Sequence, residues 1–121
     1  MVKTAYGAEL RRLWDGLCDV FVLETARNEK NGRDEPREVQ VLRGAPCRLS
    51  FSNVSPTAQQ NSVPVVQQTV KLFLSKEADV PAGSKIVVTQ EGRTAAYARS
   101  GEPAVYSSHQ EIVLVPFEEY A

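Results

Sequence analysis

Residues 49–70 read LSFSNVSPTAQQNSVPVVQQTV and contain no charged side chain, although Arg48 precedes them and Lys71 follows them directly. Both ends of the stretch belong to alternations of apolar and polar residues, one starting at Cys47 and one running on to Leu74. A two-residue period is typical of a strand with one buried face. The middle is rich in Ser, Thr, Asn, Gln and Pro, which favours a loop. The stretch therefore predicts a long neutral loop held between two strands.

Further short strands, separated by turn signals, are expected on both sides of this loop. They are predicted at 18–26, 39–42, 47–52, 65–75, 85–89, 94–98 and 106–116. The first of them is apolar on both faces, so we expect it in the centre of a sheet. Turn signals at intervals of roughly 8–12 residues are typical of small antiparallel barrels and sandwiches. We therefore predict a mainly β fold, a small antiparallel β-barrel or sandwich of about six or seven strands.

Two further segments complete the single domain expected for residues 1–121. Four large apolar residues near the N-terminus follow a helical spacing, Leu10, Leu13, Trp14 and Leu17. They predict a short helix at about residues 6–16 that ends near Gly16. Residues 27–38 read RNEKNGRDEPRE, with charges of both signs around Asn31-Gly32, a strong turn signal. This segment predicts a solvated hairpin tip, and its functional interpretation is a docking arm for a partner with matching charges.

Composition and charge exclude several classes of protein. The chain has 121 residues, 42% hydrophobic and 24% charged, with a net charge of −1, which is typical of one globular domain. No region is basic enough to hold a phosphate backbone tightly. No apolar run approaches the roughly 18–20 residues that cross a membrane, and the start lacks the apolar core of a signal peptide. We therefore expect no membrane partner and no secretion.

No combination of residues predicts a catalytic, cofactor or metal site. His109 is the only histidine and no CxxC motif accompanies it, so we expect a structural hydrogen bond in a strand. Cys18 and Cys47 each open an apolar alternation, and we expect both thiols to be reduced, buried and inert. Glycine-bearing segments at 81–85 and 90–93 do not lead into a helix and are expected to be turns. We predict a protein that is not an enzyme and has no cofactor or small-molecule substrate.

The neutral loop, predicted at 52–66, remains as the candidate functional segment. It is either a plain surface loop or a segment that pairs edge to edge when an oligomer brings several copies together. The candidate residues are Ser52, Asn53, Ser55, Pro56, Gln59, Gln60, Asn61, Val63, Val65 and Val66. In the isolated chain we expect the loop to be mobile, because its few apolar side chains cannot offset an ordering cost of about 1–2 kcal/mol per residue.

The order of these features resembles a known family. The elements that carry the resemblance are the short N-terminal helix, the CDVFVLE strand, the long polar loop, and residues 79–115, DVPAGSKIVVTQEGRTAAYARSGEPAVYSSHQEIVLV. Over most of its length, the chain is similar to the small head-closure proteins of long-tailed bacteriophages and prophages, also called stoppers or head-completion proteins.

The resemblance implies a small β-barrel that is a monomer in isolation and assembles as a ring below the portal and adaptor proteins. Loops at 52–66 would meet in the channel and close it behind the packaged DNA, which would be a partner only as channel contents. The ring would then dock tail proteins, so the chain would pass from the host cytoplasm to the virion neck. A neutral loop fits this role because it would touch DNA without binding the polyanion tightly.

Two alternatives stay open. The first is another neck component, such as a tail-completion or adaptor protein. The second is a stand-alone binding module of the OB or SH3 type, for nucleic acid or peptide. The second would need a basic face with interleaved aromatic residues, which the sequence does not show.

Overall fold

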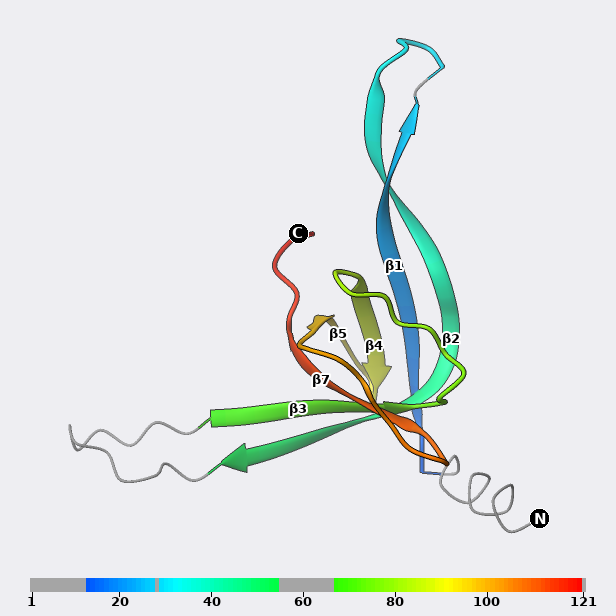
Figure 1. The fold of residues 1–121 in the computed structure, drawn as a ribbon. Helices are drawn as coiled ribbons and strands as arrows, with labels where there is room; N and C mark the ends of the chain where they lie inside the picture. Colours follow the sequence, from blue (N-terminus) through cyan, green and yellow to red (C-terminus); the bar gives the residue numbers. More distant parts are fainter. Residues whose placement is uncertain (1–12, 28, 55–66, 121) are drawn as a thin grey trace, which may run out of the picture.

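Seven antiparallel strands curl into a nearly closed barrel in the described part of the chain (Figure 1). The computed structural model describes residues 13–27, 29–54 and 67–120. The strands are β1 (Gly16–Arg27), β2 (Asp34–Val54), β3 (Gln67–Leu74), β4 (Lys85–Gln90), β5 (Arg93–Arg99), β6 (Ala104–Val105) and β7 (Gln110–Pro116). Their order is β3-β2-β1-β4-β5-β7-β6, and an additional β3–β7 pairing closes the ring. The predicted mainly β fold is confirmed.

The core fills the inside of this barrel with alternate residues of its strands. Pairs of buried apolar side chains come from β1, β2, β3, β4 and β7, namely Cys18 and Val20, Cys47 and Leu49, Leu72 and Leu74, Ile86 and Val88, and Ile112 and Leu114. Successive side chains of a strand point to opposite faces, so each pair is separated by one outward residue. β1 lies between β2 and β4, as its apolar faces predict.

One end of the barrel is covered by the connection between β3 and β4. Val80 of this connection is buried in the core, and its carbonyl accepts a hydrogen bond of 2.8 Å from Arg99. The side chain of Gln110 donates to the carbonyls of Ser75 and Ala78, both at 2.7 Å. These bonds satisfy the buried polar groups and hold the connection against the barrel.

The two cysteines are both free and fully buried, as predicted. They lie side by side in the core, and a hydrogen bond with Cys47 together with burial raises the pKa of the Cys18 thiol. Gly16 packs against the same place, where a Cβ atom would come within 3.0 Å of the Cys47 carbonyl oxygen. This crowding explains why a residue without a side chain begins β1.

The predicted end of the N-terminal helix is wrong, because Leu13 lies in a turn and Gly16 already belongs to β1. Residues 6–12 of that prediction lie outside the described residues, so a helix there stays a prediction. The side chain of Trp14 is buried, with an exposed fraction of 7%.

Two predicted strand boundaries also differ from the structure. The strands expected at 39–42 and 47–52 are parts of the single 21-residue strand β2, so Gly44, Ala45 and Pro46 do not break it. The last strand begins at Gln110 rather than at 106, because residues 106–109 form a turn closed by a 2.8 Å bond from the Tyr106 amide to the His109 carbonyl. Serines at 107 and 108 are residues that favour such a turn.

Replacing Cys18 with serine should lower the free energy of unfolding by roughly 1–3 kcal/mol, because the buried hydroxyl would have only the Cys47 sulfur, a weak hydrogen-bond partner, beside it. Urea denaturation followed by tryptophan fluorescence measures the loss. Ser107→Ala, a change in an exposed turn, is the control and should stay within about 0.5 kcal/mol of the parent protein. Rapid modification of both thiols in the native protein would contradict the buried pair.

Candidate functional site

Two β-ribbons project from the barrel in different directions, and both contain β2 (Figure 1). The charged arm, residues 22–39, is the part of the β1–β2 hairpin beyond the last β1–β4 pair, Phe21 with Lys85. The neutral ribbon, residues 52–54 and 67–69, is the part of β2 and β3 beyond the last β3–β7 pair, Val70 with Leu114. One long strand therefore serves the barrel and both projections.

β2 changes direction between the two ribbons through two bulges. Across the β1–β2 ladder, Cys18 pairs with Ala45, Val20 with Leu42, and Phe21 with Gln40, so each step leaves one extra residue on β2. Bulges of this kind bend a strand and increase its twist. Gly44 lies in the bend with φ +57°, a conformation that costs other residues energy. The segment predicted as a break is thus a bend inside a continuous strand.

Asp19 of β1 provides a hydrogen-bond acceptor for a backbone amide in this bend. Its Oδ1 accepts hydrogen bonds from the Gly44 amide at 2.8 Å and from the Gln40 side chain at 3.0 Å. The Gln40 amide group also donates to the Leu42 carbonyl at 3.2 Å. A charged residue inside the apolar CDVFVL strand is the sequence signal for this role.

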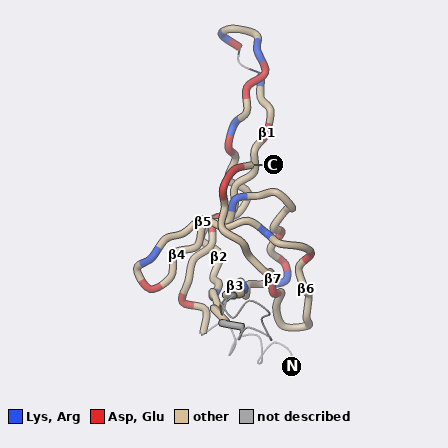
Figure 2. The backbone as a smooth tube through the Cα atoms, turned by 90° about the vertical axis from the view of Figure 1, so that its left-hand side faces the viewer, with Lys and Arg blue, Asp and Glu red and all other residues tan. Residues whose placement is uncertain are grey.

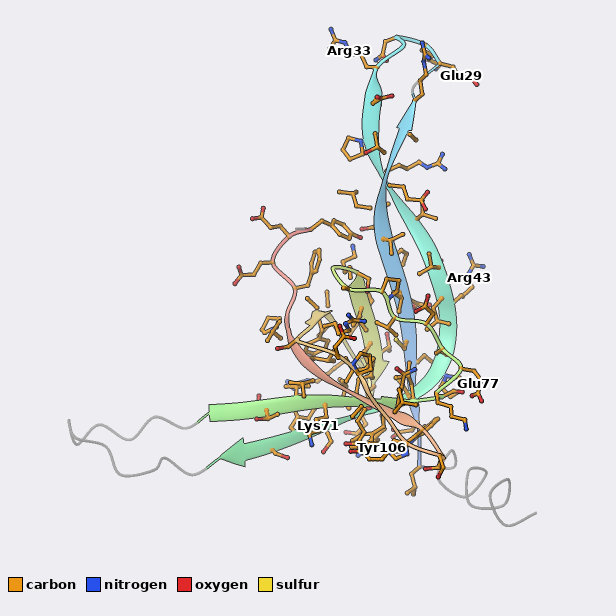
Figure 3. The ribbon with its side chains drawn as sticks, viewed as in Figure 1. Glu29, Arg33, Arg43, Lys71, Glu77 and Tyr106 are labelled. Carbon is orange, nitrogen blue, oxygen red and sulfur yellow. The ribbon has the colours of Figure 1, made fainter. Side chains whose placement is uncertain are left out.

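The charged arm is solvent-exposed and carries both signs of charge along its length (Figure 2). Its turn follows the Asn31-Gly32 prediction, with the Asn31 side chain accepting from the Arg33 amide at 2.9 Å and donating to Glu35 at 3.2 Å. Strand pairing continues as far as Arg27 with Asp34, so the tip is shorter than predicted. Figure 3 shows the side chains of Glu29 and Arg33 at the far end of the arm.

The base of the arm is tied to the C-terminal tail. Lys85 Nζ lies 2.7 Å from the Glu38 carboxylate, to which the Tyr120 hydroxyl donates a bond of 2.6 Å. The hydrogen bonds from Lys85 and Tyr120 lower the pKa of Glu38, while burial and the bond to Glu38 raise the pKa of Tyr120 to about 12. Lys85 also lies over the rings of Phe21 and Phe117, at 5.3 and 5.7 Å from their centroids. These contacts fix the direction in which the arm leaves the barrel.

The described part of the neutral ribbon contains two of the ten candidate residues of the predicted loop. Ser52 and Asn53 belong to β2, where they pair with Thr69 and Gln68 of β3. The other eight candidate residues lie outside the described residues, so the expectation of a mobile loop stays a prediction. The described part of the ribbon carries no charged side chain, and Figure 1 shows that it extends well clear of the barrel.

His109, the only histidine of the sequence, makes structural hydrogen bonds as expected. It lies in the turn before β7 rather than in a strand. Its ring nitrogens are 2.8 Å from Ser108 Oγ and 2.8 Å from Glu111 Oε2. The ring stacks on Tyr106 at 5.1 Å. In the described part of the chain, no group of three His, Cys, Asp or Glu residues is placed to hold a metal ion, and no helix is long and apolar enough to cross a membrane.

Replacing Asp19 with alanine should destabilise the protein by about 0.5–1.5 kcal/mol, because the exposed Gly44 amide would exchange the carboxylate for water. Urea denaturation measures the change, and hydrogen exchange should show faster exchange at the Gly44 amide. Asp19→Asn keeps an acceptor oxygen and should cost less. Glu24→Ala removes an exposed carboxylate from the same strand and is the control. Equal stability of the Asp19→Ala and Glu24→Ala proteins would show that the carboxylate does not support the bend.

Of the comparisons with known proteins, the one with solved structures found a similar protein. Neither a protein-family model nor a curated protein matches the chain. Among solved structures, the chain is similar to protein xkdH of the phage-like element PBSX from Bacillus subtilis, with a TM-score of 0.50 and 13% sequence identity. The match covers 83% of this chain and 91% of that one. At this identity the likeness concerns the fold, so the chain shares its barrel with a protein of a phage-like element.

Proposed function

We propose that this protein is a structural subunit of the head–tail connector of a phage or phage-like particle. It forms a ring below the portal and adaptor proteins, closes the DNA channel and offers a surface to the tail. The observation that carries the proposal is the neutral ribbon, which projects from a small barrel and holds residues 55–66 at its far end. The shared fold with a protein of a phage-like element supports the setting.

The neutral ribbon has the chemistry that a channel element needs. From Phe51 to Val54, at a rise of roughly 3.3 Å per residue, β2 extends about 10 Å away from the barrel. Its serine, asparagine, glutamine and threonine side chains are polar without being basic. Such a surface tolerates contact with DNA but gains little from counterion release, so DNA can pass it. In a ring, the ribbons of several copies together narrow the channel.

The charged arm supplies the second contact that a connector subunit requires. It leaves the barrel in a different direction from the neutral ribbon, so one chain can face the channel and reach a neighbouring ring at once (Figure 1). Exposed charges of both signs favour recognition of a complementary surface and suppress wrong partners. The subunit would fold as a monomer in the host cytoplasm and act in the virion neck.

The alternatives make different use of the same features. A tail-completion or adaptor protein would use the barrel and the charged arm, but it would not need an uncharged projection that carries a long loop. A binding module for nucleic acid would need an exposed face on which basic residues predominate. The described neutral ribbon has no basic residue, and the charged arm mixes basic residues with at least as many carboxylates. The connector subunit that closes the channel therefore accounts for more of the structure.

Replacing residues 55–66 with an Asn-Gly turn should leave the barrel folded and give particles that lose their DNA after packaging. The turn joins β2 to β3 where Val54 pairs with Gln67, so the ribbon keeps its register. The measurement is nuclease-protected DNA per particle, with the variant gene in the phage or prophage that carries it.

The matched control shortens the charged arm instead, with residues 28–33 replaced by an Asn-Gly turn. This variant should retain DNA but join fewer tails, as counted by electron microscopy. Full DNA retention by the particles with the shortened loop would contradict the closing role, whereas normal tail joining in the control would contradict only the role of the arm.

A further inference from the structure

The base of the neutral ribbon has an open strand edge. β1 pairs with β2 only as far as Gly16 with Cys47, whereas β2 continues to Val54. Beyond Cys47, β2 is paired by β3 on one side, and no described strand pairs with its other side. Backbone donors and acceptors on this side are available to a further strand.

The side chain of Gln90 already occupies the first position along this edge. The Leu49 amide donates to Gln90 Oε1 at 2.7 Å, and Gln90 Nε2 donates to the Leu49 carbonyl at 3.3 Å. A carboxamide offers one acceptor and donors in the arrangement of a peptide group. Gln90 thus replaces one peptide unit of a missing strand. Because outward-facing backbone groups recur at every second residue, Phe51 presents the next donor and acceptor on the same side.

Nothing in this part of β2 protects it against pairing. Natural edge strands carry charged side chains, proline or bulges that prevent association. Residues 50–54 read SFSNV, and their register with β3 runs without a shift from Cys47 with Leu74 to Val54 with Gln67. Phe51 is 52% exposed. Phe51 therefore adds an exposed apolar side chain to an edge that has no charge, proline or bulge at residues 50–54.

Two hollows flank this edge on opposite faces of β2. One, of about 790 Å³, is bounded by the inward-facing residues Leu49, Val88 and Tyr97. The other, of about 530 Å³, is bounded by Trp14 and by Ser50 and Phe73 of the outer face. Charges of both signs also border each hollow, Glu91 with Arg93 at the first and Glu91 with Arg48 at the second. Phe51 and Gln90 contribute to both. Successive side chains of an added strand would point to alternate faces and would therefore enter the two hollows in turn.

We propose that this edge binds an extended segment of another protein by strand addition, with consecutive apolar side chains entering the two hollows. The edge of the same ribbon on β3, residues 67–69, reads QQT and has no apolar side chain for either hollow. A second copy of the chain docking through that edge would leave both hollows unfilled. The β2 edge itself reads SFSNV at residues 50–54 and has no two consecutive apolar residues, so a second copy that docked through that edge would leave one hollow unfilled. The partner is therefore an extended strand of a different polypeptide, and this inference does not rest on the proposed function.

The test uses the full-length isotopically labelled protein and the capped peptide acetyl-Ser-Thr-Val-Leu-Val-Thr-Ser-amide as a probe. In an NMR titration, the amide of Phe51 and the side-chain amide of Gln90 should shift, and exchange of the Phe51 amide should slow at least about tenfold in the complex. The same peptide with alternate nitrogens methylated loses the donors that face β2 and should not bind.

Phe51→Lys, which places a charge on the edge, should weaken binding of the probe by at least about tenfold. Val113→Lys, the same change at an exposed residue on the outer face of β7, is the matched control and should bind normally. The spectra themselves report whether each variant is folded.

Three results would overturn the proposal. The first is no shift at Phe51 or Gln90 with the peptide at millimolar concentration. The second is equal binding of the methylated peptide. The third is a Phe51 amide already protected in the free protein, with sedimentation showing dimers, because a second copy would then occupy the edge. All three concern the isolated protein, so loss or retention of DNA by particles tests the proposed function separately.

Discussion

The structure depends on the hydrogen bond from the Gly44 amide to the carboxylate of Asp19. At this point β2 has two more residues than β1 opposite it, and the backbone groups in the bend would otherwise lack partners. Without Asp19 the exposed Gly44 amide would be left to water, and the bend would lose the side-chain contact that joins it to β1. With Asp19 in place, a single 21-residue strand can form the arm, a wall of the barrel and the neutral ribbon in turn. The charged arm and the neutral ribbon therefore share one strand, β2.

Because β2 runs through both ribbons, the barrel holds the charged arm and the neutral ribbon in a defined orientation relative to each other. The charged arm is held at its base by Lys85 and Tyr120, which both contact Glu38. The neutral ribbon is held at its base by Gln90, which contacts the backbone of Leu49. Each contact joins β2 to a segment distant in the sequence, so neither projection relies on its turn alone for its direction. A subunit that must place two surfaces relative to each other in a ring benefits from this arrangement.

The sequence predicted the parts of the fold that follow from local periodicity. Alternation of apolar residues identified the strands and most of the core, and Asn31-Gly32 identified the arm's turn, because these signals lie within a few residues of each other. The missed features depend on distant contacts. Gly44 continues a strand because Asp19, 25 residues away, accepts its amide hydrogen. Phe51 continues the alternation of Cys47 and Leu49, yet it is half exposed because β2 leaves the barrel there.

The two ribbons also differ in the residues that lie along their unpaired strand edges. The arm carries charged residues of both signs near its tip, and Pro36 lies in its β2 strand. Charge and proline are the means by which natural sheets prevent unwanted strand pairing. The neutral ribbon has neither, although its edge is equally without a strand partner in the described part of the chain. Protection of one ribbon shows that the chain can block an edge where pairing is harmful. An unprotected edge beside Phe51, with hollows on both faces, is therefore best explained as a surface that pairs with another strand.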